Sequence, residues 1–300
     1  MRKLRHGRNF RFLDNFNYYV PGVGGMFVLL LWLFVGSILG NLVMLIPMSL
    51  PSGEIFAAKY GMLISYPLMF IPPMIYAASK SGRAKYERSG MKLDSTNFGR
   101  RGPWICALMV IAATVALSFC MDLFNSMMPE MPAWLEETIK SLTTGDVWVN
   151  FICVSIFAPL FEEWLCRGIV LRGLLGNGMK PVWAIIVSAL FFAVIHLNPW
   201  QALPAFALGA LFGYVYYKTG SLKLTMLMHF TNNTLALVCG HIDALKDMDF
   251  WTDVFSGTQY GILFAAGIIL LVLVVMEFAR IPKVSPQGAC ESVPSVFDEN

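Results

Sequence analysis

The sequence predicts an all-α, polytopic membrane protein with about eight transmembrane helices, and three observations support this prediction. Hydrophobic residues make up 57% of the 300 residues and charged residues only 14%, whereas a soluble domain has roughly 45–50% and about 25%. The apolar residues form long runs, and the lysines and arginines gather in the segments between alternate runs. We therefore expect lipid to be the solvent for much of the chain.

The composition also excludes several classes of protein. The formal net charge of +3 comes from 22 Lys and Arg against 19 Asp and Glu. This charge is too small for a phosphate-binding surface, so we expect no nucleic-acid partner. The six cysteines are scattered, lie mostly inside apolar runs and include no CxxC pair. Such cysteines are typical of small buried residues rather than of disulfides or a zinc knuckle.

The predicted helices follow from the apolar runs, because a helix needs about 20 mainly apolar residues to cross a hydrocarbon core of roughly 30 Å. The first run follows a basic stretch but is too long for the core of a signal peptide, so we expect a retained membrane helix. Pro181 begins the fifth helix after a Gly-Asn-Gly end of the fourth. In chain order the predicted spans are 22–49, 55–79, 103–128, 147–175, 181–198, 202–219, 222–240 and 257–279.

The positive charges test this arrangement. With the N-terminus inside, the inner segments contain 19 of the 22 Lys and Arg, among them Arg167 and Arg172. Acidic residues gather instead in the outer segments 130–146 and 243–253. The positive-inside rule therefore predicts an even number of spans with both termini cytoplasmic, and we expect a bacterial plasma membrane.

We expect three regions along the chain. The first, 1–146, contains three transmembrane helices. The second, 147–240, is a helical core that contains the residues we expect to be catalytic. The third, 241–300, contains an outer loop, the last transmembrane helix and a cytoplasmic tail.

Ionisable residues at membrane depth are costly and indicate function, and three short stretches of the second region carry them. Glu163 and Arg167 are four residues apart on one helix, so they can pair. Glu162 is rotated by about 100° from Glu163, which frees it to face a cavity. Pro159 precedes them and removes a backbone hydrogen bond, which predicts a local kink or opening of the helix.

The other two stretches supply imidazoles. His229 and Asn233 share one face of a helix, so the amide can hold the imidazole or both can point donors into a cavity. His196 lies one turn after Phe192, which we expect to pack or to form a wall. We expect Glu162 and His196 at similar depth, each about 20 Å from the turn that joins their helices. His229, by contrast, is expected only about 10 Å into its own helix. That helix must be tilted or start earlier for the three to meet.

These residue types support hydrolysis. A carboxylate with imidazoles can hold a water, remove its proton and return a proton to a leaving amine. A second imidazole with an amide can stabilise the oxyanion of a tetrahedral intermediate. The residues Glu162, His196 and His229 could instead bind zinc with one open position.

Taken together, the three motifs resemble the signature of the CPBP family of intramembrane endopeptidases, which includes CAAX prenyl endopeptidases and bacteriocin-processing or immunity proteins. The resemblance covers roughly 147–240. The motifs are Glu162-Glu163-x-x-x-Arg167, Phe192-x-x-x-His196 and His229-x-x-x-Asn233.

The resemblance implies a membrane protease whose site is reached from the cytoplasmic side. It implies that Glu162 is the general base, acting on a water shared with His196, while His229 and Asn233 form the oxyanion site. Glu163, Arg167 and Phe192 would support them. We favour a mechanism without a cofactor, with zinc as the alternative, because the sequence has no HExxH pair.

The leading hypothesis is thus an endopeptidase that cleaves a membrane-associated or lipidated peptide or protein; the sequence does not indicate its oligomeric state. One alternative is a non-catalytic peptide-binding or bacteriocin self-immunity protein on the same scaffold. Another is a transporter in which the glutamates and histidines relay protons, although the sequence has no internal repeat of the kind that many transporters show.

Overall fold

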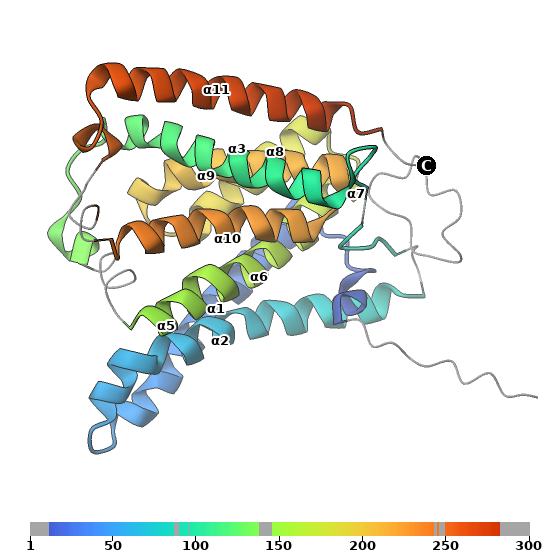
Figure 1. The fold of residues 1–300 in the computed structure, drawn as a ribbon. Coiled ribbons are helices and arrows are strands. Elements are labelled where there is room, and N and C mark those ends of the chain that lie inside the picture. Colours follow the sequence, from blue (N-terminus) through green and yellow to red (C-terminus); the bar gives the residue numbers. More distant parts are fainter. Residues whose placement is uncertain are drawn as a thin grey trace, which may run out of the picture.

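The computed structural model describes residues 12–86, 90–95, 97–137, 146–242, 245 and 250–282. All regular structure within these residues is helical, which confirms the predicted all-α class. The helices lie roughly lengthwise beside one another, with α11 along one side of the body and the α1–α2 pair along the other (Figure 1). The predicted basic N-terminal stretch and the cytoplasmic tail beyond 282 lie outside the described residues.

The helices begin and end close to the positions that the sequence predicts. The N-terminal region contains η1 (Phe12–Phe16), α1 (Val23–Met48), α2 (Gly53–Ala84) and α3 (Gly102–Asn125). The central region contains α5 (Val147–Asn150), η2 (Phe151–Phe157), α6 (Ala158–Glu163), η3 (Trp164–Leu171), α7 (Arg172–Gly176), α8 (Pro181–Ile195), α9 (Pro199–Thr219) and α10 (Leu222–Cys239). The C-terminal region contains η4 (Trp251–Asp253) and α11 (Gly257–Ala279).

Five helices among the described residues are long and apolar enough to cross a bilayer, so the predicted number of eight is not confirmed. They are Val23–Met48, Gly53–Ala84, Gly102–Asn125, Val147–Gly176 and Gly257–Ala279. The remaining three predicted spans do form helices, α8, α9 and α10. α8 has only 15 residues, whereas α9 and α10 are less apolar and lie largely inside the body, where helix–helix contacts replace contacts with lipid. With these apolar helices the chain is an integral membrane protein.

The fourth span is one helix from Val147 to Gly176, interrupted by two π-helical stretches, η2 and η3. Pro159 is the second residue of α6, directly after η2. The local opening predicted at this proline is therefore present. The short α6 between the two π-helical stretches ends in Glu162 and Glu163. Such π-helical turns often lie at functional sites.

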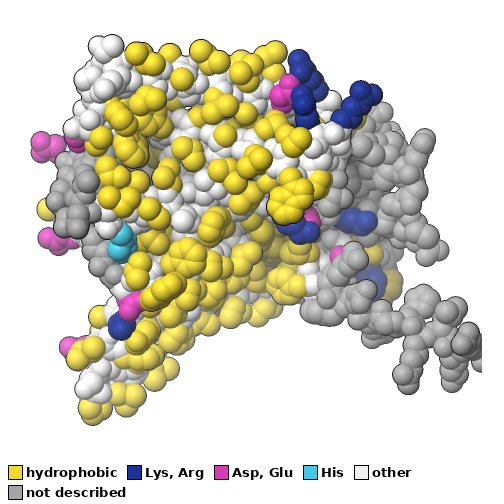
Figure 2. Space-filling model, in the orientation of Figure 1, with side chains coloured by type: hydrophobic (Ala, Val, Ile, Leu, Met, Phe, Trp, Pro, Cys, Tyr) yellow, Lys and Arg dark blue, Asp and Glu magenta, His cyan; other side chains and the backbone are white. Residues whose placement is uncertain are grey.

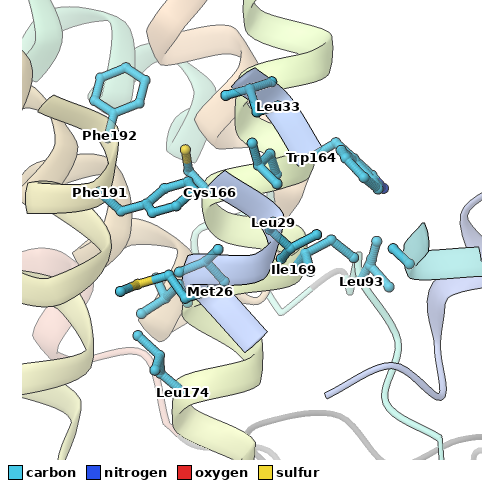
Figure 3. Close-up of a cluster of buried hydrophobic side chains, with 14 of the residues drawn as sticks. Met26, Leu29, Leu33, Leu93, Trp164, Cys166, Ile169, Leu174, Phe191 and Phe192 are labelled. Carbon is cyan, nitrogen blue, oxygen red and sulfur yellow. The ribbon is translucent and has the colours of Figure 1, made fainter. Parts of the chain in front are cut away.

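The α1–α2 pair packs against this interrupted helix through a buried apolar cluster. Figure 3 shows Met26, Leu29 and Leu33 of α1 beside Trp164 and Ile169. Within the pair, a Cβ added at Gly36 would lie 2.1 Å from the carbonyl oxygen of Met69. The two helices thus approach as closely as a bare backbone allows.

Charged side chains gather at the two ends of the helices (Figure 2). The ends of the helices near Ala84, Gly102, Pro181, Thr219 and Ala279 carry most of the described lysines and arginines, and we call this the basic end. The opposite ends, near Gly53, Asn125, Val147, Cys239 and Gly257, carry Glu54, Asp122, Glu130, Asp146 and Asp253, and we call this the acidic end. Lys59 is an exception, because it lies at the acidic end in an ion pair with Asp146.

Two of the arginines that the sequence assigns to the cytoplasmic surface, Arg167 and Arg172, are in fact fully buried. Among the described residues the guanidinium of Arg172 has no carboxylate partner, and it donates instead to five backbone carbonyls. They belong to Phe16, Asn17, Tyr19, Met91 and Gly168. A buried charge is tolerated when its donors are satisfied in this way. Arg172 therefore ties three separate segments together at the basic end.

Candidate active site

A cavity of about 360 Å³ lies in the helical body and brings together the four residues that we predicted to be catalytic. Glu162, His196, His229 and Asn233 all line it. The remaining lining residues are mostly apolar and come from α2, η2, α6 and α8–α10: Met62, Tyr66, Val154, Ala158, Phe192, Gln201, Pro204, Ala205, Leu208, Phe212, Asn232, Ala236 and Leu237. A concave, mainly apolar site with a few converging polar groups is typical of ligand-binding cavities.

Glu162 presents one free oxygen to this cavity. Its Oε1 accepts a hydrogen bond from the hydroxyl of Tyr66 on α2. Its Oε2 is buried and has no hydrogen-bond partner among the described residues. The same Oε2 lies 4.0 Å from Nε2 of His196. The carboxylate is therefore hydrogen-bonded at one oxygen and, among the described residues, without a partner at the other.

His196 is fixed by the end of its own helix. It is the C-cap residue of α8, and its Nδ1 lies 2.7 Å from the carbonyl oxygen of Phe192. Because a carbonyl only accepts, Nδ1 carries the proton, which leaves the lone pair of the neutral imidazole on Nε2. The turn that follows is tight, with Leu197 in a left-handed conformation at φ 51°. With Nδ1 held by the carbonyl of Phe192, Nε2 of His196 lies 4.0 Å from Oε2 of Glu162.

The neighbouring Glu163 has a different set of partners and does not line the cavity. Its Oε1 accepts from Arg167 at 2.6 Å, which confirms the pairing predicted from their spacing. The same oxygen lies 3.0 Å from Nδ1 of His229. All three side chains are nearly or fully buried. The imidazole of His229 is thus held by Glu163, whereas the sequence offered Asn233 as the residue that could hold it.

The guanidinium of Arg167 is enclosed by two aromatic rings. Its Cζ lies 4.5 Å from the ring centroid of Phe192 and 5.1 Å from that of Phe212. One of its nitrogens also donates to the carbonyl oxygen of Gly209. Cation–π contacts of this kind strengthen when water is excluded. Phe192 therefore separates the buried arginine from the cavity and also contacts the rings of both His196 and His229.

A chain of amide hydrogen bonds fixes the orientation of Asn233. Ser118 on α3 donates to Oδ1 of Asn232, and Nδ2 of Asn232 donates to Oδ1 of Asn233. Nδ2 of Asn233 donates to the carbonyl oxygen of Val154 at 2.8 Å. An amide nitrogen carries two protons, so one N–H of Asn233 is left over for the cavity that it lines.

Sequence reasoning did not identify three residues of this arrangement: Tyr66, Asn232 and Ser118. Tyr66 lies almost a hundred positions from Glu162 in a helix without a motif, so nothing in the sequence indicates their contact. Asn232 offered a signal, because two adjacent amides inside an apolar helix are unusual. The polar Ser118 in the apolar run of α3 offered a weaker one.

The described side chains do not fit a zinc ion. No group of three or more His, Cys, Asp or Glu converges among them as metal ligands would. We therefore derive no step through a metal.

A comparison with known families matches the part of the chain that contains Glu162, His196, His229 and Asn233. Residues 144–235 match the family described as type II CAAX prenyl endopeptidase Rce1-like. An uncharacterized 24.3 kDa protein of Escherichia coli is 32% identical over 99 residues, which are 32% of this chain and 46% of that protein. The UPF0177 protein YaiF of Lactococcus lactis is 33% identical over 90 residues, 30% of this chain and 39% of that protein.

The chain thus spans less than half the length of these curated relatives, and no solved structure matches it. The matched segment contains all three motifs that carried the predicted resemblance. Residues 144–235 of this integral membrane protein are similar to the Rce1-like type II CAAX prenyl endopeptidases, which confirms the predicted family resemblance.

Proposed function

We propose that the protein is an intramembrane endopeptidase that hydrolyses a peptide bond with a water activated by Glu162 and His196. The observation that carries this proposal is the free Oε2 of Glu162, which faces Nε2 of His196 across 4.0 Å inside the cavity. Both atoms are acceptors. A water about 2.8 Å from each would span the gap and donate one proton to each.

In the first step the water oxygen attacks the carbonyl carbon of the scissile bond, while Oε2 of Glu162 accepts a proton from the water. A carbon–oxygen bond forms and the carbonyl oxygen becomes an oxyanion. When the carbon–nitrogen bond breaks, the proton held on Glu162 passes to the leaving amine. Tyr66 keeps its hydrogen bond to Oε1 throughout, so the proton is received and returned at the same oxygen.

The oxyanion would be stabilised by donors on the opposite wall. His229 lines the cavity and donates through Nδ1 to Glu163; with a proton on both ring nitrogens it would also donate through Nε2 to the oxyanion. Asn233 has one amide proton that Val154 does not use. Preorganised donors aimed at a developing negative charge contribute strongly to the rate, because they need no rearrangement during the reaction.

The substrate class follows from the cavity walls. Apart from the polar group around Glu162, the lining is built from small and apolar side chains such as Ala158, Ala205 and Leu237. These walls suit an extended peptide segment with apolar residues on both sides of the scissile bond. A membrane-associated or lipidated peptide or protein has that chemistry.

Cleavage assays with the purified full chain and a library of apolar peptides test this proposal. We expect Glu162→Gln and His196→Ala to abolish cleavage while both variants unfold at the same temperature as the unchanged protein. Glu54→Gln is the matched control, because Glu54 is exposed at the acidic end of α2 and does not line the cavity. Normal cleavage by either cavity variant would contradict the assignment, and so would an unchanged protein that binds the peptides without cleaving any.

Metal dependence is tested separately. Because the proposed steps need only side chains and water, we expect cleavage to survive exhaustive treatment with a chelator. Activity that disappears with the chelator and returns with zinc would contradict this part of the proposal.

A further inference from the structure

We propose that the cavity opens to the extracytoplasmic side of the membrane, so that the peptide substrate approaches from the outer leaflet. This inference rests on the proposed function for its substrate, but its geometry does not depend on cleavage. Three observations carry it: the position of the lining residues along their helices, the closed floor of the cavity, and the charges at the two ends of the molecule.

The lining residues come from the halves of the helices nearer the acidic end. On α9 they begin at Gln201, the third residue of the helix, and on α10 they extend to Leu237, close to its end. On α2 the lining residues Met62 and Tyr66 lie in the first half of a helix that begins at the acidic end. His196 caps the end of α8 that lies away from the basic Pro181 end.

The floor of the cavity lies near the middle of the helices. Glu162, Phe212 and His229 are the lining residues that lie at or just beyond the midpoints of their helices towards the basic end. Beneath them come Glu163 and Arg167, both fully buried.

Among the described residues the body is packed from this floor towards the basic end, and a depression of about 570 Å³ at that end, beside Asp14, Asp94 and Lys223, shares no lining residue with the cavity. The helix 164–172 is buried at every residue. The guanidinium of Arg172 then holds the N-terminal segment against this end of the helices. It donates hydrogen bonds to the backbone carbonyls of Phe16, Asn17 and Tyr19. The turn from α9 to α10 is covered as well, because Gly220 accepts from the backbone amide of Ser95 and the amide of Leu222 donates to Asp94. A peptide could not reach Glu162 from this end without unfolding these contacts.

The charges identify the basic end as the cytoplasmic one. Lysines and arginines accumulate on the cytoplasmic side of membrane proteins, whereas acidic residues have little influence on orientation. The basic end carries most of the described cations (Figure 2). The closed side of the cavity therefore faces the cytoplasm. The resemblance to CAAX endopeptidases implies access from the cytoplasm, and the position of the cavity favours the opposite face.

Cysteine labelling in sealed vesicles tests this inference without any need for activity. Gln201→Cys and Met62→Cys place a thiol on two different walls of the cavity, and neither residue takes part in the proposed chemistry. Tyr86→Cys is the matched control at the basic end, where Tyr86 is 89% exposed. All three variants are made in a full chain in which Cys239 and Cys290 are replaced by serine, because Cys239 is only half-buried and Cys290 lies outside the described residues.

We expect a membrane-impermeant thiol reagent to label both cavity cysteines in right-side-out vesicles as completely as it does after detergent is added. Tyr86→Cys should react only after detergent. Cavity cysteines that react only in inside-out vesicles, or that stay unlabelled even in detergent, would overturn the inference, as would a Tyr86→Cys that reacts from the outside. If labelling follows the expected pattern but the unchanged protein cleaves no peptide, the proposed function fails while the direction of access stands.

Discussion

Glu162 and Glu163 are adjacent in the sequence, yet they belong to two regions of the molecule with opposite character. Glu163 lies between the floor of the cavity and the basic end, in the part that we call the closed half. One of its oxygens accepts from both Arg167 and His229, and the side chain is fully buried. Glu162 lies beside the cavity, in what we call the open half; among the described residues its only hydrogen bond is with Tyr66, and it faces His196. The rotation of about 100° between neighbouring helical residues is enough to place the two carboxylates in different environments.

This difference shows how charged side chains are accommodated among apolar helices. In the closed half, the charges of Glu163 and Arg167 nearly cancel, and this buried ion pair orients His229 and the ring of Phe192. Both carboxylates keep one buried oxygen without a hydrogen-bond partner among the described residues, but Glu162 lines a cavity that could admit water, whereas Glu163 does not. Stability should therefore depend on the closed half and activity on the open half.

The largest expected effect on stability comes from breaking the closed half. Arg167→Met leaves the carboxylate of Glu163 buried without its cation, and removal of one partner of a buried ion pair typically costs about 3–5 kcal/mol of unfolding free energy. Denaturant unfolding in detergent micelles measures this loss.

The control for this variant is a double substitution. Glu163→Gln together with Arg167→Met removes both charges and keeps an acceptor for His229, so most of the lost stability should return. A double variant that is no more stable than Arg167→Met would show that the ion pair is not what stabilises the closed half.

We expect a smaller effect from Tyr66→Phe, which tests how the hydrogen bond to Glu162 contributes to activity. The substitution removes the only hydrogen bond that holds Oε1 of Glu162 among the described residues, and hydrogen bonds to charged groups contribute about 1.5–3 kcal/mol. We expect kcat to fall by roughly tenfold or more with little change in KM. Tyr60→Phe, on the same helix but outside the cavity, should leave both constants unchanged. A Tyr66→Phe variant with unchanged kcat would separate Tyr66 from the chemistry.

The smallest effect concerns the ion pair at the acidic end, where Lys59 of α2 lies 3.1 Å from Asp146. The hydrogen bond from Lys59, together with the backbone amide of Val149, holds the pKa of the Asp146 carboxyl below its ordinary value of 3.8. A lowered pKa means that the stabilisation is present above that ordinary value and disappears as the pH falls through the lowered pKa. The thermal midpoints of Lys59→Met and the unchanged protein should therefore differ slightly at about pH 7 and converge at about pH 2. A difference that persists at the lower pH would contradict this account of the pair.

The sequence predicts the helices and the family resemblance well, because both depend on local patterns. Apolar runs determine the helix positions, and Pro181 marks the beginning of α8. The ion pair of Glu163 with Arg167 follows from helical spacing alone. The number of spans could not be predicted in the same way, because α8 is only 15 residues long, and α9 and α10 lie largely in the body, where they do not need the hydropathy of a lipid-facing helix.

Contacts between helices that are far apart in the chain could not be predicted from the sequence. Spacing within one helix suggested that Asn233 could hold His229, but a carboxylate from another helix is the stronger partner and it holds the imidazole instead. The depth of His229 also depends on tertiary structure. A Cβ added at Gly168 would lie 3.5 Å from a methyl group of Leu222, so α10 begins level with the interior of the long helix. This deep start brings His229 to the level of Glu163.

The most direct test of the contrast is to compare Glu162→Gln with Glu163→Gln in the same cleavage and unfolding assays. We predict that Glu162→Gln loses at least about 100-fold in cleavage and keeps the stability of the unchanged protein. Glu163→Gln should lose about 3 kcal/mol of unfolding free energy, because it leaves the guanidinium of Arg167 buried without its counter-ion. The opposite pattern, a stable and inactive Glu163→Gln beside an unstable and active Glu162→Gln, would contradict the division of the site into a closed half and an open half.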